Sequence, residues 1–247
     1  MNADYVAEYE SMEKGHWWWQ ARRDIVLNIL HDLLAQRPPR EGAPTLLDIG
    51  CGAGVNLASF RESFDCVGVE PDPVLVEKAR ANSQVPVHQG TLPSGLPPLD
   101  TRFDYVVLLD VLEHIDDDLA ALDAAASQMK PDGRMVINVP ALPWMWSVHD
   151  EVNQHKRRYL AGGLRELIRG AGLKTSLIRY WGSFPVPLAF LERQSKRLLG
   201  KEQSYRVPIP SPRVNSLCRQ LLRTEFSLTK SLGLPFGLSL IAVVHKP

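Results

Sequence analysis

The sequence predicts an α/β fold in which helices cover both faces of a mostly parallel sheet. From Thr45 to Pro140, short apolar runs alternate with segments whose apolar residues recur at helical spacing. Strands that alternate with helices over this length favour right-handed βαβ units. The 247 residues, 45% of them hydrophobic and 23% charged, suffice for one large domain with its own core and exclude a disordered or fibrous chain.

The first 44 residues are expected to form a helical cover and a linker. The string HWWWQARR at 16–23 is followed by apolar residues on one helical face, namely Val26, Ile29, Leu30, Leu33 and Leu34. RPPREGAP at 37–44 cannot continue that helix, because proline lacks an amide donor and biases the preceding residue toward extended backbone.

The central region is expected to contain five strands and three helices. In chain order, the strands fall at 45–50, 66–70, 85–90, 103–110 and 134–140, and the helices at 56–64, 73–82 and 119–129. Asp116, Asp117 and Asp118 open the third helix, where the exposed amides of a first turn favour carboxylates.

The C-terminal region adds two strands and a basic insertion. A helix at 164–171 stops at Gly172, as a left-handed cap allows, and a strand follows at 174–181. An amphipathic helix begins at Ser211 and Pro212, and the last strand covers 238–246. We therefore expect a core made of 45–183 with 235–247, and a basic helical insertion at 184–234.

A glycine-rich turn follows the first strand. LLDIGCGAGVN at 46–56 places Asp48 at the strand end and then alternates Gly50, Gly52 and Gly54 before a helix. Glycines at such a turn let the backbone approach a ligand closely. The next strand ends at Glu70, where a carboxylate can accept hydrogen bonds from ribose hydroxyls. The spacing differs from the dinucleotide pattern GxGxxG, and the two acids favour a ligand site over a bare tight turn.

These residues resemble the class I S-adenosylmethionine-dependent methyltransferases, a seven-stranded Rossmann-like family. The resemblance covers roughly 45–140 and the last strand, and implies a three-layer α/β/α sandwich that uses S-adenosylmethionine and releases S-adenosylhomocysteine. It implies that the first acid and the glycine loop hold the methionyl part, that Glu70 binds the ribose and that Asp110 faces the amino group.

The adenine segment departs from the family pattern. Gly90-Thr91-Leu92 stands where the family usually has Gly-Asp, so a carboxylate is missing there. Cys51, inside the glycine loop, is expected to pack rather than to react. The cofactor-binding residues expected from the resemblance are Asp48, Gly50, Cys51, Gly52, Gly54, Glu70, Pro71, Gly90, Thr91, Leu92, Asp110 and Val111.

Other chemistries remain open for the same residues. Asp110 and Glu113 in LLDVLEH can be an acid and base pair or, with His114, metal ligands, but a helix start also explains acids there, and we expect no metal. A nicotinamide-dependent oxidoreductase is one alternative function, which the glycine spacing disfavours. A non-catalytic cofactor-binding scaffold is another, against which the polar loop at 149–159 weighs.

That loop, WSVHDEVNQHKRRY at 146–159, is expected to meet the acceptor, because loops at the carboxyl ends of parallel strands form the ligand crevice. A histidine there can take a proton from a hydroxyl or amine, although not every methyl transfer needs a base. Arginines can bind a carboxylate or phosphate, and aromatic faces stabilise a cation. Alternatively, the histidines, arginines and tyrosine brace the loop against the N-terminal helix through hydrogen bonds, and the tryptophans are core or interface aromatics. The expected catalytic residues are His149 and His155, and the expected substrate-binding residues are Trp18, Trp146, Arg157, Arg158 and Tyr159.

The charge balance and the cysteine content limit the partners and the compartment that the sequence predicts. The chain has 28 basic and 28 acidic residues, so no nucleic-acid partner is expected. Residues 193–230 hold nine Lys or Arg against two acids, a net +7, which suits either peripheral contact with the inner membrane surface or a solvated lid or dimer contact. Three irregularly spaced cysteines, with no apolar leader or membrane-length run, indicate a cytoplasmic protein. The expected acceptor is a small molecule or a lipid-linked metabolite.

Overall fold

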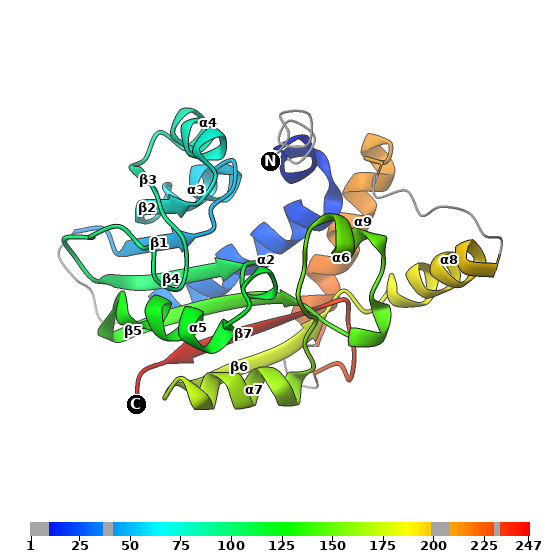
Figure 1. Cartoon of the computed structure of the whole chain (residues 1–247). Helices are drawn as coiled ribbons and strands as arrows, with labels where there is room; N and C mark the ends of the chain where they lie inside the picture. Colours follow the sequence, from blue (N-terminus) through cyan, green and yellow to red (C-terminus); the bar gives the residue numbers. More distant parts are fainter. Residues whose placement is uncertain (1–9, 37–41, 199–207, 230–232) are drawn as a thin grey trace.

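The computed structural model describes residues 10–36, 42–198, 208–229 and 233–247, which include a seven-stranded sheet. Its strand order is β3-β2-β1-β4-β5-β7-β6 (Figure 1). β7 runs antiparallel to both neighbours, and the other pairs are parallel. The strands are β1 (Thr45–Ile49), β2 (Asp65–Glu70), β3 (Val87–Gln89), β4 (Phe103–Leu109), β5 (Met129–Pro140), β6 (Lys174–Trp181) and β7 (Ser239–His245). The predicted fold class is confirmed.

Helices cover both faces of the sheet. Figure 1 shows α5 and α7 on one side, with α2 and α9 on the other. The helices are α2 (Trp17–Ala35), α3 (Val55–Phe60), α4 (Pro73–Ser83), α5 (Asp118–Ser127), α6 (Val148–Val152), α7 (Ala161–Gly170), α8 (Val186–Leu198) and α9 (Pro212–Leu228), with single turns η1 (Leu112–His114) and η2 (Pro143–Met145). None of the described helices is long and apolar enough to cross a bilayer.

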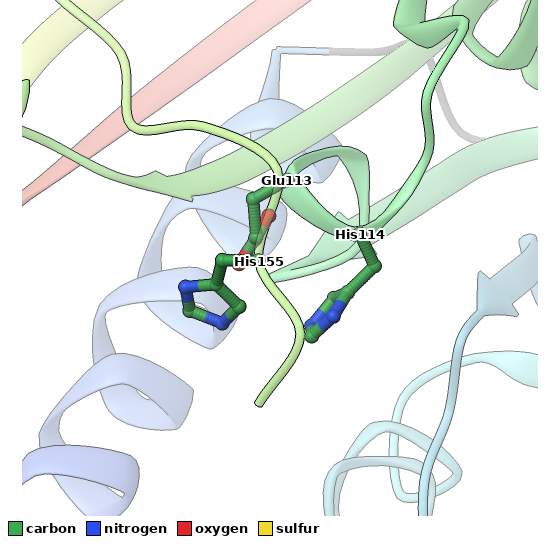
Figure 2. Close-up of side chains that lie close together, drawn as sticks. All are labelled: Glu113, His114 and His155. Carbon is green, nitrogen blue, oxygen red and sulfur yellow. The ribbon is translucent and has the colours of Figure 1, made fainter. Parts of the chain in front are cut away.

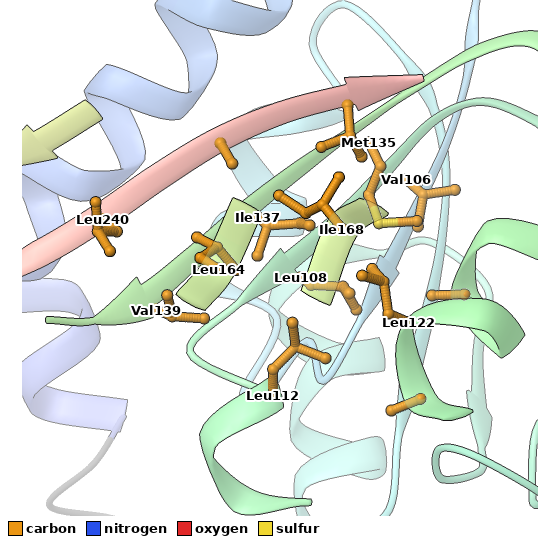
Figure 3. Close-up of a cluster of buried hydrophobic side chains, with 14 of the residues drawn as sticks. Val106, Leu108, Leu112, Leu122, Met135, Ile137, Val139, Leu164, Ile168 and Leu240 are labelled. Atoms are coloured by element: carbon orange, nitrogen blue, oxygen red, sulfur yellow. The ribbon is translucent and has the colours of Figure 1, made fainter. Parts of the chain in front are cut away.

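Side-chain alternation along the strands divides the apolar interior into two clusters. Val106 and Leu108 of β4 pack with Leu122 of α5 and Ile168 of α7, as Figure 3 shows. The intervening Val107 belongs to the opposite cluster, together with residues of α2, α3, α4 and α9. Such two-sided burial is what a parallel sheet under two helical layers requires, and it explains why β4 is apolar at every position except Asp104.

The N-terminal helix α2 and the inserted helix α9 pack on each other. The Trp17 amide donates to Oδ1 of Asn215 at 2.7 Å, and Arg219 makes two hydrogen bonds to Asp24 at 2.7 and 2.8 Å. Leu222 of α9 is buried against this cover. Other apolar residues of α9, namely Val214, Leu217, Leu221 and Leu228, point outward and are 45–75% exposed.

Several elements differ from the expectation, among them α6, which lies in the expected loop, and α7, which begins at Ala161 and not at 164. β5 begins at Met129, earlier than expected, because Met129 pairs with Phe103 of β4 ahead of a register shift, after which the pairing resumes at Arg134. α3 ends at Phe60, four residues before the expected end. α8 is not predicted, since the prolines at 185 and 187 suggest irregular chain. Pro185 immediately precedes the helix and Pro187 lies in its first turn, where a missing amide costs the helix little.

Candidate active site

The glycine loop between β1 and α3 adopts backbone that only glycine tolerates well. Gly50, Gly52 and Gly54 have φ angles of +78°, +56° and +77°. The Gly50 amide donates to the Val69 carbonyl at 2.8 Å, which ties the loop to β2. A Cβ on Gly50 would lie 2.5 Å from Val111, and one on Gly54 would lie 2.7 Å from the Ala79 backbone. Gly50 and Gly54, at the two ends of the loop, are therefore required both by their positive φ angles and by the lack of space for a Cβ atom.

Two acids flank the loop, as the sequence suggested. Asp48 is buried, and neither of its carboxylate oxygens has a hydrogen-bond partner among the described residues. Glu70 accepts hydrogen bonds from the amides of Gly52, at 3.0 Å, and Asp72, at 3.1 Å. A third carboxylate, Glu13, comes from the helical turn before α2 and is also buried.

Burial controls the ionisation of these acids. It raises the pKa of Asp48 to about 8, and the nearby Glu13 and Glu70 carboxylates add to the rise while Arg22 opposes it. Burial likewise raises the pKa of Glu13 to about 7 and raises that of Glu70. Near pH 7, Asp48 is therefore mostly protonated, and a cation beside it would favour its ionised form.

The raised pKa of Asp48 predicts a pH-dependent stability. Its folded-state pKa lies above the ordinary 3.8, so the folded chain holds the proton more tightly than the unfolded chain does. The free energy of unfolding should thus fall as the pH rises from about 4 to about 8. Asp48→Asn cannot titrate, so its melting temperature relative to wild type should be higher at pH 8.5 than at pH 5 in thermal scans. The exposed Asp65→Asn is the control, and an equal pH dependence in both variants would contradict the assignment.

A chain of contacts links the N-terminal cover to the end of β4. The guanidinium of Arg22, which is buried, pairs with Asp110, and the side-chain amide of Asn138 donates to Asp110 at 2.6 Å. Asn138 in turn accepts from the Trp181 indole at 2.8 Å. Asp110 is a non-glycine residue at φ +58°, a strained conformation that these partners hold in place.

Trp18 belongs to this chain of contacts rather than to an open surface. Its ring stacks on Trp181 with the centroids 4.4 Å apart. A Cβ on Gly182 would lie 2.6 Å from the Trp18 ring. Trp18 thus contacts Trp181, which donates to Asn138, and its predicted contact with substrate stays a prediction.

Carboxylates predominate at this edge of the sheet. We call Glu13, Asp48, Glu70, Asp110 and Glu113 the acid cluster. Glu113 is completely buried, and burial together with Asp110 raises its pKa well above the ordinary value. The positive charge of Arg22 lowers the pKa of Glu13, Asp48 and Glu113, and its guanidinium contacts Asp110. Four of the five carboxylates thus interact with this guanidinium, and the cluster makes a site suited to a cationic ligand.

The expected adenine-side residues lie around β3 and the loop after it. The Gly90 amide donates to the Glu70 carbonyl at 3.1 Å, and Thr91 Oγ1 donates to the Leu92 carbonyl at 3.2 Å. Leu92 is buried in the core and Pro71 is exposed. Burial raises the pKa of the Cys51 thiol far above its usual range, so this cysteine is a packing residue and not a nucleophile.

Asp150 organises the loop that follows β5. Its carboxylate accepts two hydrogen bonds from Arg158, at 2.7 and 3.0 Å, and lies 2.9 Å from Nδ1 of His155. Arg158 also donates to the Ala141 carbonyl at 3.0 Å. The guanidinium expected to bind an acceptor is thus engaged by Asp150 and Ala141, whereas the bracing alternative placed these contacts with the N-terminal helix.

The other residues expected to contact the acceptor are also partnered within the chain. Arg157 and the Tyr159 hydroxyl both contact Asp118, each at 2.8 Å, which fixes the loop to the start of α5. The His149 ring lies against the Asn153 amide, and desolvation lowers its pKa to about 4, so it is neutral at pH 7. Trp146 is half-buried. Their catalytic and substrate-binding roles stay predictions.

Sequence reasoning missed Glu13, Arg22 and Asn138. Arg22 lies inside the HWWWQARR string, yet helical spacing alone does not say that an arginine will reach Asp110. Asn138 is a polar residue within the apolar run of β5, which is a usable signal for a functional side chain at a strand end. Glu13 carries no signal in its local sequence.

Comparison with known proteins identifies the family. The profile of the methyltransferase domain family matches residues 17–191, which is well over half of the chain. The chain belongs to this family. The match begins with α2, so the helix that carries Arg22 is part of the shared domain.

Among curated relatives, the ubiquinone biosynthesis O-methyltransferase of Xylella fastidiosa is 30% identical over 113 residues, 43% of this chain and 46% of the relative. The mitochondrial ubiquinone biosynthesis O-methyltransferase of Schizosaccharomyces pombe is 26% identical over 155 residues, 56% of this chain and 55% of the relative. The chain spans about half or less of the length of these relatives.

Solved methyltransferase structures share the fold over nearly the whole chain. A Thermotoga maritima S-adenosylmethionine-dependent methyltransferase, a possible histamine N-methyltransferase, aligns with a TM-score of 0.61 at 20% identity, covering 99% of this chain and 97% of the other. Magnesium protoporphyrin IX methyltransferase from Synechocystis PCC 6803, solved with S-adenosylhomocysteine, gives 0.61 at 12% identity, covering 100% and 96%. At these identities the likeness concerns the fold.

Proposed function

We propose that this chain transfers the methyl group of S-adenosylmethionine to an oxygen of a small-molecule or lipid-linked acceptor, leaving S-adenosylhomocysteine. The observation that carries the proposal is the buried acid cluster beside a left-handed glycine loop, with both oxygens of Asp48 lacking a partner in the described structure. Buried carboxylates of this kind need a compensating group. The donor supplies a sulfonium and an ammonium, and its methyl group is an electrophile.

Individual residues can then be given roles toward the donor. Asp110, oriented by Arg22 and Asn138, would bind the ammonium group, and Asp48 would lower the cost of placing positive charge at the loop. Glu70 would bind the ribose hydroxyls with the lone pairs that its two backbone hydrogen bonds leave available. Gly90, Thr91 and Leu92 would border the adenine. The acid cluster gives little support to a nicotinamide cofactor, whose pyrophosphate is an anion.

Oxygen as the accepting atom is supported by the names of the curated relatives, which are O-methyltransferases. Transfer by in-line displacement needs the acceptor atom close to the methyl group and water excluded. The cover formed by α2, which inserts Arg22 at the strand end, would exclude water from the donor.

A lipid-linked acceptor is supported by the outward surface of α9. Its exposed residues include Val214, Leu217, Leu221, Leu228 and Arg213, and the side chains of Arg219 and Arg223 are 36% and 41% exposed. The acidic residue of this helix, Glu225, instead accepts hydrogen bonds from the backbone amides of residues 182–184. The expected cationic contact is weakened, since Arg219 and Arg223 pair with Asp24 of α2. Apolar insertion at a membrane surface, through a helix free of exposed acids, is the form of contact that we propose.

Calorimetry tests the identity of the donor. Calorimetry should show binding of S-adenosylmethionine and S-adenosylhomocysteine and none of NAD. Glu70→Gln should weaken donor binding about tenfold to a hundredfold through loss of charge-assisted hydrogen bonds, on the order of 1–3 kcal/mol. The exposed Glu77→Gln should bind like wild type. Binding of NAD alone, or equal donor affinity in both variants, would overturn the proposal.

The acceptor is then sought with methyl-labelled donor in a cell extract separated into aqueous and lipid fractions. Label should enter the lipid fraction, and Leu217→Glu/Leu221→Glu should lose that label while it keeps donor binding. Ser216→Glu/Gln220→Glu adds the same charges at the same spacing on exposed, non-apolar positions of α9 and should retain it. Label confined to the aqueous fraction would exclude the lipid-linked acceptor and leave a small molecule.

A further inference from the structure

Three potential ligand side chains converge next to the acid cluster. Figure 2 shows Glu113 and His114, both on η1, meeting His155 from the loop after α6. One ligand atom from each residue lies within 4.8 Å of the others. Two imidazoles and a carboxylate are a donor set that divalent transition metals favour. The sequence did not predict a metal, because His155 is far from the other two residues along the chain.

The carboxylate of Glu113 has no hydrogen-bond partner among the side chains and backbone groups of other described residues. It is completely buried, and neither of its oxygens accepts a hydrogen bond from another described residue. Buried polar atoms are nearly always satisfied, so this carboxylate points to a missing partner. In Figure 2 it is directed toward the His155 ring.

Both histidines are oriented by a second partner. His155 places Nδ1 2.9 Å from Asp150, which Arg158 and Ser147 hold in turn. His114 makes a hydrogen bond to the backbone carbonyl of Asn153. Histidines that bind metals commonly donate one ring N–H to a carboxylate or carbonyl, which leaves the other nitrogen as the ligand. This arrangement gives the Asp150 network a purpose beyond bracing the loop.

We propose that Glu113, His114 and His155 bind one divalent transition-metal ion of the zinc type, and that the ion binds the oxygen of the methyl acceptor. The second part rests on the proposed function. Three protein ligands leave a coordination position open. Glu113 is buried and His114 is exposed, so an acceptor would approach such an ion from the solvent side. His155 is then a ligand, in place of the base expected from the sequence.

The ion would activate an acceptor hydroxyl. A bound divalent cation lowers the pKa of a hydroxyl that coordinates it. The O–H bond breaks and its proton passes to solvent, and an oxygen lone pair then forms the bond to the methyl carbon. The carbon–sulfur bond breaks, and its electron pair stays on sulfur, which gives the neutral thioether. No oxidant or reductant is needed.

Metal binding can be measured without any turnover. The untagged full chain is treated with a chelator, dialysed and titrated with Co²⁺ while the visible absorption is followed, and Zn²⁺ is added to compete. We expect one equivalent to saturate the signal and Zn²⁺ to abolish it. His114→Ala removes an exposed side chain, so the fold should persist, and it should weaken Co²⁺ binding by at least about tenfold. The exposed His88→Ala, on β3, is the matched control and should bind as wild type does.

The outcomes separate this inference from the proposed function. Absence of a saturable Co²⁺ signal, or equal binding by the His114 and His88 variants, overturns the metal site, whereas donor binding and methyl transfer by the stripped protein would then stand. A saturable site lost in His114→Ala, in a protein that binds no S-adenosylmethionine, would support the metal site and refute the methyl transfer. Methyl transfer at an undiminished rate in His114→Ala would refute the role of the ion toward the acceptor.

Discussion

Replacing Arg22 with leucine is expected to lower the free energy of unfolding by about 3–5 kcal/mol, because the change leaves the Asp110 carboxylate beside other acids without its ion-pair partner. Arg22 is 2% exposed, so water cannot take its place at little cost. Urea denaturation followed by circular dichroism measures the effect. Arg22→Leu/Asp110→Asn should recover part of the loss, since it removes the uncompensated charge.

The matched control lies on α9, which packs on the helix that carries Arg22. Arg219→Leu breaks the pair with Asp24, whose arginine is 36% exposed, and should cost at most about 1 kcal/mol. Equal losses in the two variants would show that burial of Arg22 does not set the strength of its contact. The donor should also bind more weakly to Arg22→Leu, because Asp110 would lose the group that orients it.

Substituting alanine for Gly54 is expected to cost about 2–4 kcal/mol of stability and to abolish donor binding. The left-handed backbone at φ +77° accounts for about 1–2 kcal/mol, and the rest comes from a Cβ 2.7 Å from the backbone of Ala79, which cannot rotate away. Chemical denaturation and calorimetry with S-adenosylmethionine measure the two effects.

Gly42 supplies the comparison, since it has φ +81° and open space where a Cβ would be. Gly42→Ala should lose only the conformational part, about 1–2 kcal/mol, and keep donor binding. If the two alanine variants are equally stable, the close approach between the loop and α4 is not what requires glycine at position 54.

The parts of the site that the sequence predicted are those whose signal is local. Gly50, Gly52 and Gly54 all have positive φ angles within one short loop, which a glycine pattern in the sequence signals. Asp48 and Glu70 lie near the ends of neighbouring parallel strands, so the sheet topology brings them to one edge. Strands and most helices followed from apolar spacing for the same reason.

The missed parts depend on contacts between distant segments. Arg22 reaches Asp110, and His114 meets His155, only after the sheet has brought η1, α2 and the loop after β5 together. The sequence pattern placed Arg158 in a polar loop but could not show that its guanidinium is paired with Asp150. The outward direction of Leu217 and Leu221 likewise depends on which face of α9 meets α2, which spacing does not specify.

The ion pair between Arg22 and Asp110 also constrains how the protein is made. The ribosome synthesises the arginine 88 residues before its partner, and Asn138 later still. Contacts between such distant positions form late, after the entropy of closing the intervening chain has been overcome. During translation the apolar face of the tryptophan-rich helix therefore stays unpacked until the strands on which the helix docks have been synthesised.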